Sequence, residues 1–93
     1  MVKLIKTADT LTQRDWLAYL RAARGLPKLA EDAIPAEHSL RTVQAAASAG
    51  WLDCGGHDPA DVEAWPLSVD VQTLARSINA VYVEATQPDP KAS

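Results

Sequence analysis

The residue types most often used in catalysis and metal binding gather in one short segment. Cys54 and His57 are three positions apart, between Asp53 and Asp58, and two glycines separate them. A cysteine nucleophile would also need an orienting third group and a pocket. A zinc site needs about four ligands, normally from two separated clusters, and the second histidine, His38, is distant in the sequence. We therefore expect a surface loop shaped by its glycines, with no metal ion and no cofactor.

Asp58, Asp61 and Glu63 form a second group that could perform acid–base chemistry. Paired carboxylates of the glycosidase type need a cleft around the substrate, and a chain of 93 residues is barely large enough to fill its own core. Asp58 and Asp61 are better explained by the start of a short helix, where a carboxylate interacts favourably with the helix dipole. No glycine loop of a phosphate-binding type is present. We expect the protein not to be an enzyme.

Basic residues concentrate near the N-terminus. Residues 1–28 carry six basic and two acidic residues, whereas residues 29–93 carry three basic and ten acidic residues, for a net charge of −3. Arg14, Arg21, Arg24 and Lys28 fall along one side of a helix if that helix extends to Lys28. Such a row can bind nucleic-acid phosphates, but the negative net charge favours a solvated face or an acidic protein segment.

The elements that would position these groups are helical, because the chain is rich in alanine and contains no phenylalanine. Thr12 and Asp15 form the pattern of a helix N-cap, and Gly25 ends that helix. Pro35 suits the first turn of the next helix, and Gly50 its end. We predict an all-α fold, a small bundle of about four helices at residues 12–24, 35–49, 59–65 and 67–85.

The chain is expected to form a single domain over residues 1–93. Residues 1–10 are expected to form an extended arm or a short strand, and residues 86–93 a flexible tail. A lone cysteine suits a reducing compartment, and neither a membrane-spanning run nor a signal peptide is evident. These features predict a soluble, cytoplasmic protein.

The last predicted helix carries the most regular apolar pattern. Its apolar residues step by four and three positions: Leu67, Val71, Leu74, Ile78, Val81 and Ala85. Such a seam is more often core than interface, but Tyr82 and Val83 widen the apolar arc enough for it to serve a partner as well. The three tryptophans are open to the same two interpretations, because Trp is enriched at interfaces.

Several segments resemble the small tail assembly chaperones of siphophages and prophages. They are Gly50-Trp51-Leu52, Asp58-Pro59-Ala60-Asp61-Val62, Trp65-Pro66-Leu67-Ser68-Val69, Leu74-Ala75-Arg76-Ser77-Ile78 and Asp89-Pro90-Lys91. The resemblance covers residues 40–91. Trp65 departs from it, because leucine would be more usual at that position.

The resemblance implies a non-enzymatic chaperone or adaptor that binds a helical, tape-measure-like client in the cytosol of a bacterial host. An apolar groove between helices would receive the client helix, and the basic row would steer acidic client segments. The expected anchors are Trp16, Tyr19, Leu20, Trp65, Val81 and Tyr82.

Two other functions remain open. The chain could be a structural homo-oligomeric phage subunit in which the seam Val71–Leu74–Ile78–Val81 pairs with a neighbour. It could also be a small nucleic-acid-binding regulator that uses Arg14, Arg21 and Arg24, although nucleic acid is the less favoured partner.

Overall fold

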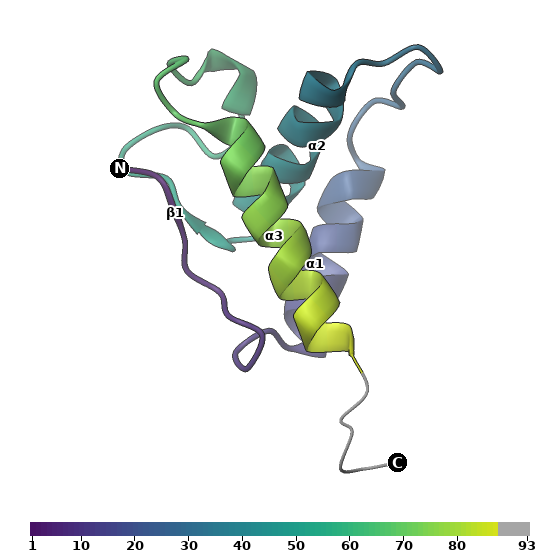
Figure 1. Cartoon of the computed structure of the whole chain (residues 1–93), viewed down its shortest axis with the longest axis vertical. Helices are drawn as coiled ribbons and strands as arrows, with labels where there is room; N and C mark the ends of the chain where they lie inside the picture. The colour runs from purple at the N-terminus through teal and green to yellow at the C-terminus, as the bar shows by residue number, and fades with distance from the viewer. Residues whose placement is uncertain (88–93) are drawn as a thin grey trace.

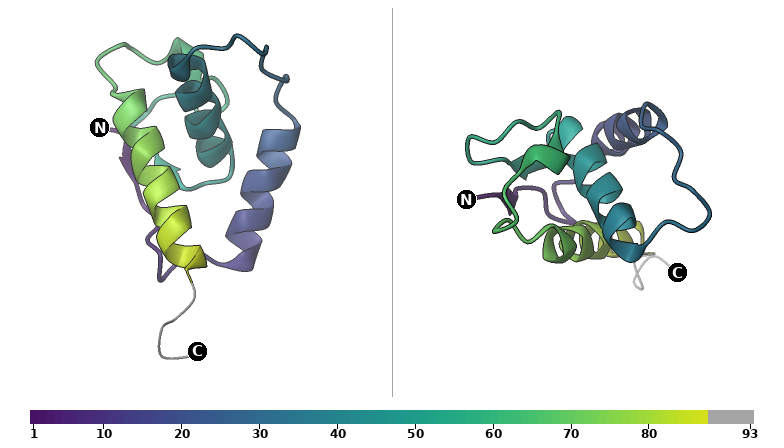
Figure 2. Two further views of the ribbon diagram at one scale, coloured as in Figure 1. Left: turned by 45° about the vertical axis from the view of Figure 1, so that its right-hand side comes forward. Right: turned by 90° about the horizontal axis from the view of Figure 1, so that it is seen from above.

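Helix α2 (Pro35–Ser48) lies at the centre of the structure, a computed structural model that describes residues 1–87. Helix α1 (Gln13–Arg24) packs on one side of α2, and helix α3 (Val71–Thr86) packs on the other (Figure 1). Figure 2 shows α1 and α3 converging toward the end at which α1 begins and α3 ends. The mostly helical fold expected from the sequence is confirmed.

A two-stranded antiparallel sheet corrects the all-α prediction. Strand β1 (Lys3–Leu4) pairs with β2 (Leu52–Asp53), with Leu4 opposite Leu52. The Ile5 N–H extends the pairing by donating to the carbonyl of Trp51 at 2.9 Å. The N-terminal residues are thus a short strand followed by an irregular segment, one of the two forms expected for residues 1–10.

Helices α1 and α2 begin and end close to the predicted residues. The Thr12 hydroxyl accepts from the Asp15 N–H at 3.2 Å, and the Asp15 carboxylate accepts from the Thr12 N–H at 2.9 Å. This is the expected N-cap, with a reciprocal pair of bonds. Lys6 adds an ion pair to the same carboxylate at 3.4 Å, which fastens the N-terminal segment to the start of α1.

The predicted helix at 59–65 is only a single 3₁₀ turn, η1 (Val62–Ala64). Its backbone is held from outside by Gln44 of α2. The Gln44 side-chain amide accepts from the Val62 N–H at 2.9 Å and donates to the Pro59 carbonyl at 2.7 Å. These bonds satisfy backbone groups that an α-helix would have paired internally. Within residues 1–87 the fold therefore has three α-helices and one 3₁₀ turn rather than a clear bundle of about four helices.

The last helix begins at Val71, four residues later than predicted. Asp70 caps it, because its carboxylate accepts from the Thr73 N–H at 3.0 Å and from the Thr73 hydroxyl at 2.7 Å. Residues 66–69 instead form a turn, which leaves Leu67 fully exposed. The helix extends to Thr86, so the first residue of the predicted tail is helical. Residues 88–93 of that predicted tail lie outside the described residues.

Gly50 places a core tryptophan at the end of α2. Its positive φ of 81° lets the chain reverse, with the Trp51 N–H bonded to the Ala46 carbonyl and the Gly50 N–H to the Ala47 carbonyl. This is a Schellman motif, the common glycine-dependent helix end. It turns Trp51 back onto the core, where its side chain is completely buried.

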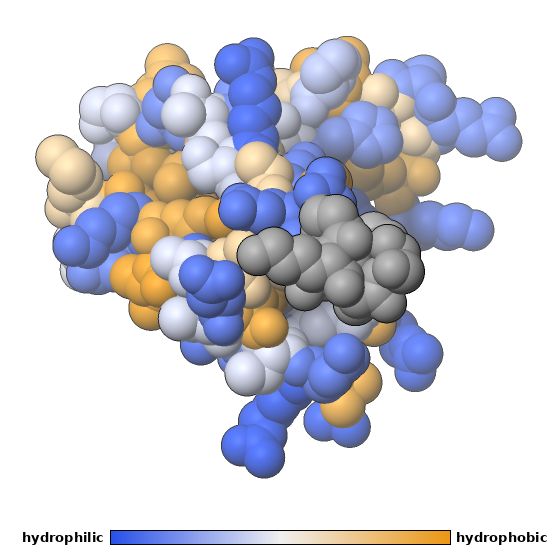
Figure 3. Space-filling model, turned by 60° about the horizontal axis from the view of Figure 1, so that its bottom comes forward, coloured by the Kyte–Doolittle hydropathy of each residue, from blue (hydrophilic) through white to orange (hydrophobic). Residues whose placement is uncertain are grey.

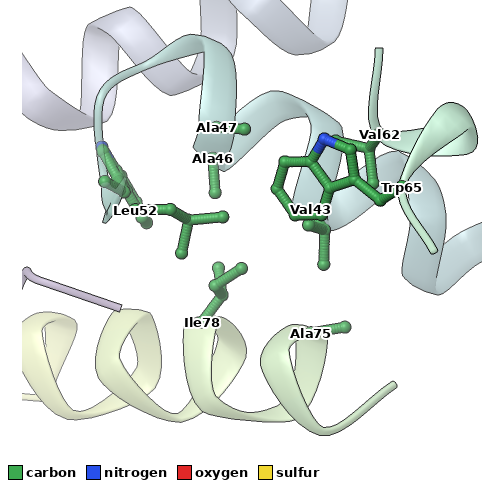
Figure 4. Close-up of a cluster of buried hydrophobic side chains, with 9 residues drawn as sticks. Val43, Ala46, Ala47, Leu52, Val62, Trp65, Ala75 and Ile78 are labelled. Carbon is green, nitrogen blue, oxygen red and sulfur yellow. The ribbon is translucent and has the colours of Figure 1, made fainter. Parts of the chain in front are cut away.

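The core forms between α2, α3 and the segment that joins them. Figure 4 shows Ile78 of α3 pointing toward Val43 of α2 and toward Leu52, while Trp65 and Val62 close the far side. The small side chains of α2, including Ala46 and Ala47, are buried in this cluster. They allow α3 to approach α2 closely. Ile78 of the seam is thus in the core and Val71 and Leu74 pack against it, as the commoner interpretation of such seams predicts, whereas Leu67 is fully exposed.

Candidate functional site

The Cys54–His57 segment is a tight loop. Gly55 and Gly56 both adopt positive φ, and the Asp53 carboxylate accepts from the Gly55 N–H at 3.1 Å. Burial and the nearby carboxylates of Asp53 and Asp58 raise the pKa of the Cys54 thiol. The thiol is therefore held in its protonated, less nucleophilic form. In residues 1–87, no group of three or more His, Cys, Asp and Glu side chains is arranged to hold a metal ion.

The carboxylates of Asp58, Asp61 and Glu63 do not gather around one common site. Asp58 accepts from the Ala60 N–H at 2.9 Å within its own turn. Its backbone carbonyl accepts from the Trp65 indole N–H at 2.7 Å. Asp61 and Glu63 are exposed on either side of the buried Val62. The segment therefore serves to position Trp65 and leaves acidic side chains at the surface.

Four aromatic rings form a continuous row through the molecule. Tyr82 of α3 stacks on Trp16 of α1 with ring centroids 4.3 Å apart, Trp16 stacks on Tyr19 at 5.4 Å, and Tyr19 stacks on Trp51 at 4.9 Å. The Trp51 indole N–H donates to the Asp15 carbonyl at 3.2 Å. Burial raises the pKa of Tyr19. We call these four residues the aromatic row; it joins α1 to the core through side chains.

Helix α1 is the least buried of the three α-helices and contacts the core mainly through the aromatic row. It contains no buried residue, whereas α2 has four and α3 has two. No Cα atom of α1 lies within 8 Å of one in α3, so the Trp16–Tyr82 stack bridges them by side chains alone. One side of α1 is thus only partly covered, and its opposite side faces outward.

The six anchors expected from the sequence do not share one surface. Trp65 is buried at 8% exposure and belongs to the core, whereas Leu20 is 44% exposed. The other four are half-buried: Trp16, Tyr19, Val81 and Tyr82. Three of these four are committed to the aromatic row. Among the expected anchors, Leu20 is therefore the one classed as exposed.

Leu17 is an exposed apolar residue that the sequence-based reasoning missed. It is 45% exposed, one helical turn before Leu20. The anchors expected on α1 were Trp16, Tyr19 and Leu20, without Leu17. The spacing of Leu17 and Leu20, three positions apart, was the available signal for a second, outward apolar strip.

The outward side of α1 also carries the predicted basic row, without Lys28. Arg14, Arg21 and Arg24 are exposed, and within residues 1–87 none of them forms an ion pair. Lys28 lies beyond the end of the helix, because Gly25 caps α1 after Arg24. The wheel of α1 places Arg24 between the two leucines and Arg14 and Arg21 beyond Leu17, so that the three arginines lie along one edge of the apolar strip. We call these five residues the α1 face: Arg14, Leu17, Leu20, Arg21 and Arg24.

Two cavities adjoin along α2 on another side of the molecule. The first, about 230 Å³, lies between the connector at residues 26–29, α2 and η1. The second, about 530 Å³, lies between α2, η1 and residues 65–72. They share Leu40, Val62 and Glu63. We call the pair the α2 groove; its walls are mainly apolar and its rim carries charges of both signs.

Two polar side chains of α2 hold the first cavity in shape. Arg41 donates to the carbonyls of Pro27 at 2.8 Å and Ala23 at 3.0 Å, which fastens the connector and the last turn of α1. Gln44, one turn later, fastens the segment that contains η1 through the bonds described above. The connector and η1 are therefore fixed to α2 on opposite sides of the groove.

Seen from the end at which α1 begins, the surface is mixed (Figure 3). Apolar atoms gather on the side where β1 lies in Figure 1, and hydrophilic side chains project around the edge. Within the described part of the chain, no helix has the length and apolar character required to cross a membrane.

Comparisons with protein-family models, curated proteins and solved structures find no match for this chain.

Proposed function

We propose that the protein is a non-enzymatic binding module, an assembly chaperone or adaptor, that takes an acidic amphipathic helix on its α1 face. The observation that carries the proposal is the state of α1. It has no buried residue, and it presents Leu17 and Leu20 nearly half exposed beside three exposed arginines. Two apolar side chains one helical turn apart on an exposed side of a helix are typical of surfaces to which another helix docks.

The charges of the α1 face specify the chemistry of the partner. Arg14, Arg21 and Arg24 have no ion-pair partner in the part of the chain that the structure describes. Arginine side chains along one edge of an apolar strip favour carboxylates beside the apolar anchors of a docked helix. The expected partner is thus a helix with leucine-like anchors on one side and Glu or Asp beside them.

The rigid backing of α1 supports the same use. The aromatic row holds the inward side of α1 through Trp16 and Tyr19, and the Trp51 indole bonds to its first turn. A helix fixed in this way loses little conformational freedom when a partner binds. The resemblance to tail assembly chaperones fits a helical, tape-measure-like client in a bacterial cytosol, and that identity is part of the proposal.

Fluorescence anisotropy with a labelled synthetic amphipathic helix, leucines on one side and glutamates on both flanks, tests the proposal. We expect saturable binding that weakens with salt, and about tenfold weaker binding by Leu17→Gln/Leu20→Gln. The matched control is Val83→Gln, because Val83 is 52% exposed on α3. Binding that is equally strong with a lysine-flanked probe would contradict the proposal.

A nucleic-acid-binding regulator is the second candidate, favoured by the three arginines that share one exposed side of α1. The two functions differ in what the leucines do. Phosphate binding depends on the arginines and falls steeply with salt. Duplex DNA retention that disappears in Arg14→Gln/Arg21→Gln/Arg24→Gln but survives Leu17→Gln/Leu20→Gln would support this candidate over the first.

A further inference from the structure

The residues that line the α2 groove differ in charge from those of the α1 face. Its two halves share an apolar floor at Leu40 and Val62, and Leu67 stands fully exposed at its rim. The charged residues that line it are Glu37, Asp61, Glu63, Asp70, Lys28 and Arg41. Four acids against two bases give a formal balance of −2.

The free charges of the groove are mainly acidic. Arg41 already donates to two backbone carbonyls, so its donors face the connector. Asp61 and Glu63 are exposed, and within residues 1–87 neither forms an ion pair. Partners with an apolar strip flanked by bases therefore suit the groove, because carboxylates at a rim attract guanidinium groups to an apolar floor.

The chain itself carries a surface of that description. The α1 face has two leucines beside three arginines, a charge of +3. It shares no residue with the groove lining, so the two surfaces are made by different residues. Pairing of two α1 faces about a two-fold axis is disfavoured, because it would place arginines against arginines.

We propose that the α1 face of one copy docks in the α2 groove of a second copy. The contact is heterologous: each molecule contributes two different surfaces and keeps one free. Self-association is therefore open-ended or ring-forming, and it rises with concentration and falls with salt. This inference rests on the same α1 face as the proposed function, and an acidic client helix competes with the groove for that face.

Two single-surface variants test the contact. Leu17→Gln/Leu20→Gln impairs the α1 face and leaves the groove intact. Glu63→Lys/Leu67→Lys impairs the groove and leaves the α1 face intact; both of its sites are exposed and outside the three helices. A third variant, Asp61→Lys, repeats the groove test at another exposed side chain if the double substitution disturbs folding. Circular dichroism of each variant checks that helicity is retained.

Mass in solution by light scattering, over a range of concentrations at low salt, gives the result. We expect the wild-type mass to grow with concentration, each variant alone to self-associate about tenfold more weakly, and an equimolar mixture to form one-to-one pairs and nothing larger. A wild type that is monomeric throughout, or a mixture that does not pair, would overturn the inference. So would a wild-type dimer of fixed mass that persists in both variants.

The groove variant also separates this inference from the proposed function. It retains the α1 face, so it should bind the acidic probe helix at least as well as the wild type. If the solution mass of the groove variant rises with concentration as that of the wild type does, while the probe helix still binds, self-docking is wrong and the client proposal stands. If the probe does not bind any form of the protein while the mixture still pairs, the client proposal is wrong and self-docking stands.

Discussion

Gln44→Met removes the two hydrogen bonds that attach residues 59–62 to α2, together with the exposed bond from the Gln44 amide to the Ser48 hydroxyl at 3.1 Å. Methionine has a similar length and a good helix propensity. The substitution deletes the acceptor of the Val62 N–H at 2.9 Å and the donor to the Pro59 carbonyl at 2.7 Å. Val62 itself is buried, so its N–H has little access to water as a replacement partner.

Each lost hydrogen bond is worth about 1 kcal/mol, and a buried unpaired donor adds about 1 kcal/mol or more. We therefore expect a loss of about 2–3 kcal/mol in the free energy of unfolding. For a domain of this size, the midpoint of thermal unfolding should fall by roughly 10–20 °C. Because η1 positions Val62 and Trp65 in the core, the loss should appear in the global transition.

Urea unfolding followed by tryptophan fluorescence measures the effect. The matched control is Gln72→Met, the same chemical change at an exposed site of α3, which should alter stability by less than about 0.5 kcal/mol. If Gln44→Met is no less stable than Gln72→Met, the Gln44 side chain does not hold this segment, and the reason given for the 3₁₀ turn is refuted.

Three further perturbations follow from other contacts. Arg41→Met should lower stability by about 2 kcal/mol, because two charge-assisted bonds to backbone carbonyls are lost; chemical denaturation measures it. Thr12→Ala should cost about 1 kcal/mol through the N-cap of α1, visible as a lower thermal midpoint. Hydrogen bonds from Thr73 hold the pKa of Asp70 below its ordinary 3.8. The contribution of this carboxylate to the free energy of unfolding should therefore be complete above that pH. It should be lost as the pH drops through the lower pKa of the folded state, because the unfolded chain binds the proton first. Asp70→Asn should reduce this loss of stability at acid pH, measured by urea unfolding at successive pH values.

The sequence predicts those parts of the fold that rest on local signals. The cap at Thr12, the proline at the start of α2 and the glycine at its end are short-range features, and the structure uses all three. The return of Trp51 to the core follows from the Gly50 turn. These signals hold because each satisfies backbone groups within a few residues of itself.

The parts that failed depend on distant residues. Residues 59–65 carry helix-start signals, yet Gln44 from α2 provides the partners for their backbone. The two-residue strand β2 has no readable alternation, and its pairing with β1 joins residues far apart in the chain. The seam that begins at Leu67 is regular, but the Asp70 cap starts the helix later.

The candidate site was predicted in part. Arg14, Arg21 and Arg24 lie on one exposed side of α1 as expected. Leu17, 45% exposed, was missed because the expected anchors on α1 were Trp16, Tyr19 and Leu20. Trp65, expected as an anchor, is in the core, since a chain of this size needs its large side chains to fill its interior.

Chemical-shift mapping of the labelled protein with the acidic probe helix tests the central claim most directly. The α1 face predicts that the largest changes fall on amides of Leu17, Leu20, Arg21 and Arg24, with smaller changes transmitted to Trp16 and little change around Leu67. Changes centred on Leu40 and Leu67, with α1 unaffected, would place client binding in the α2 groove and contradict the assignment of the α1 face.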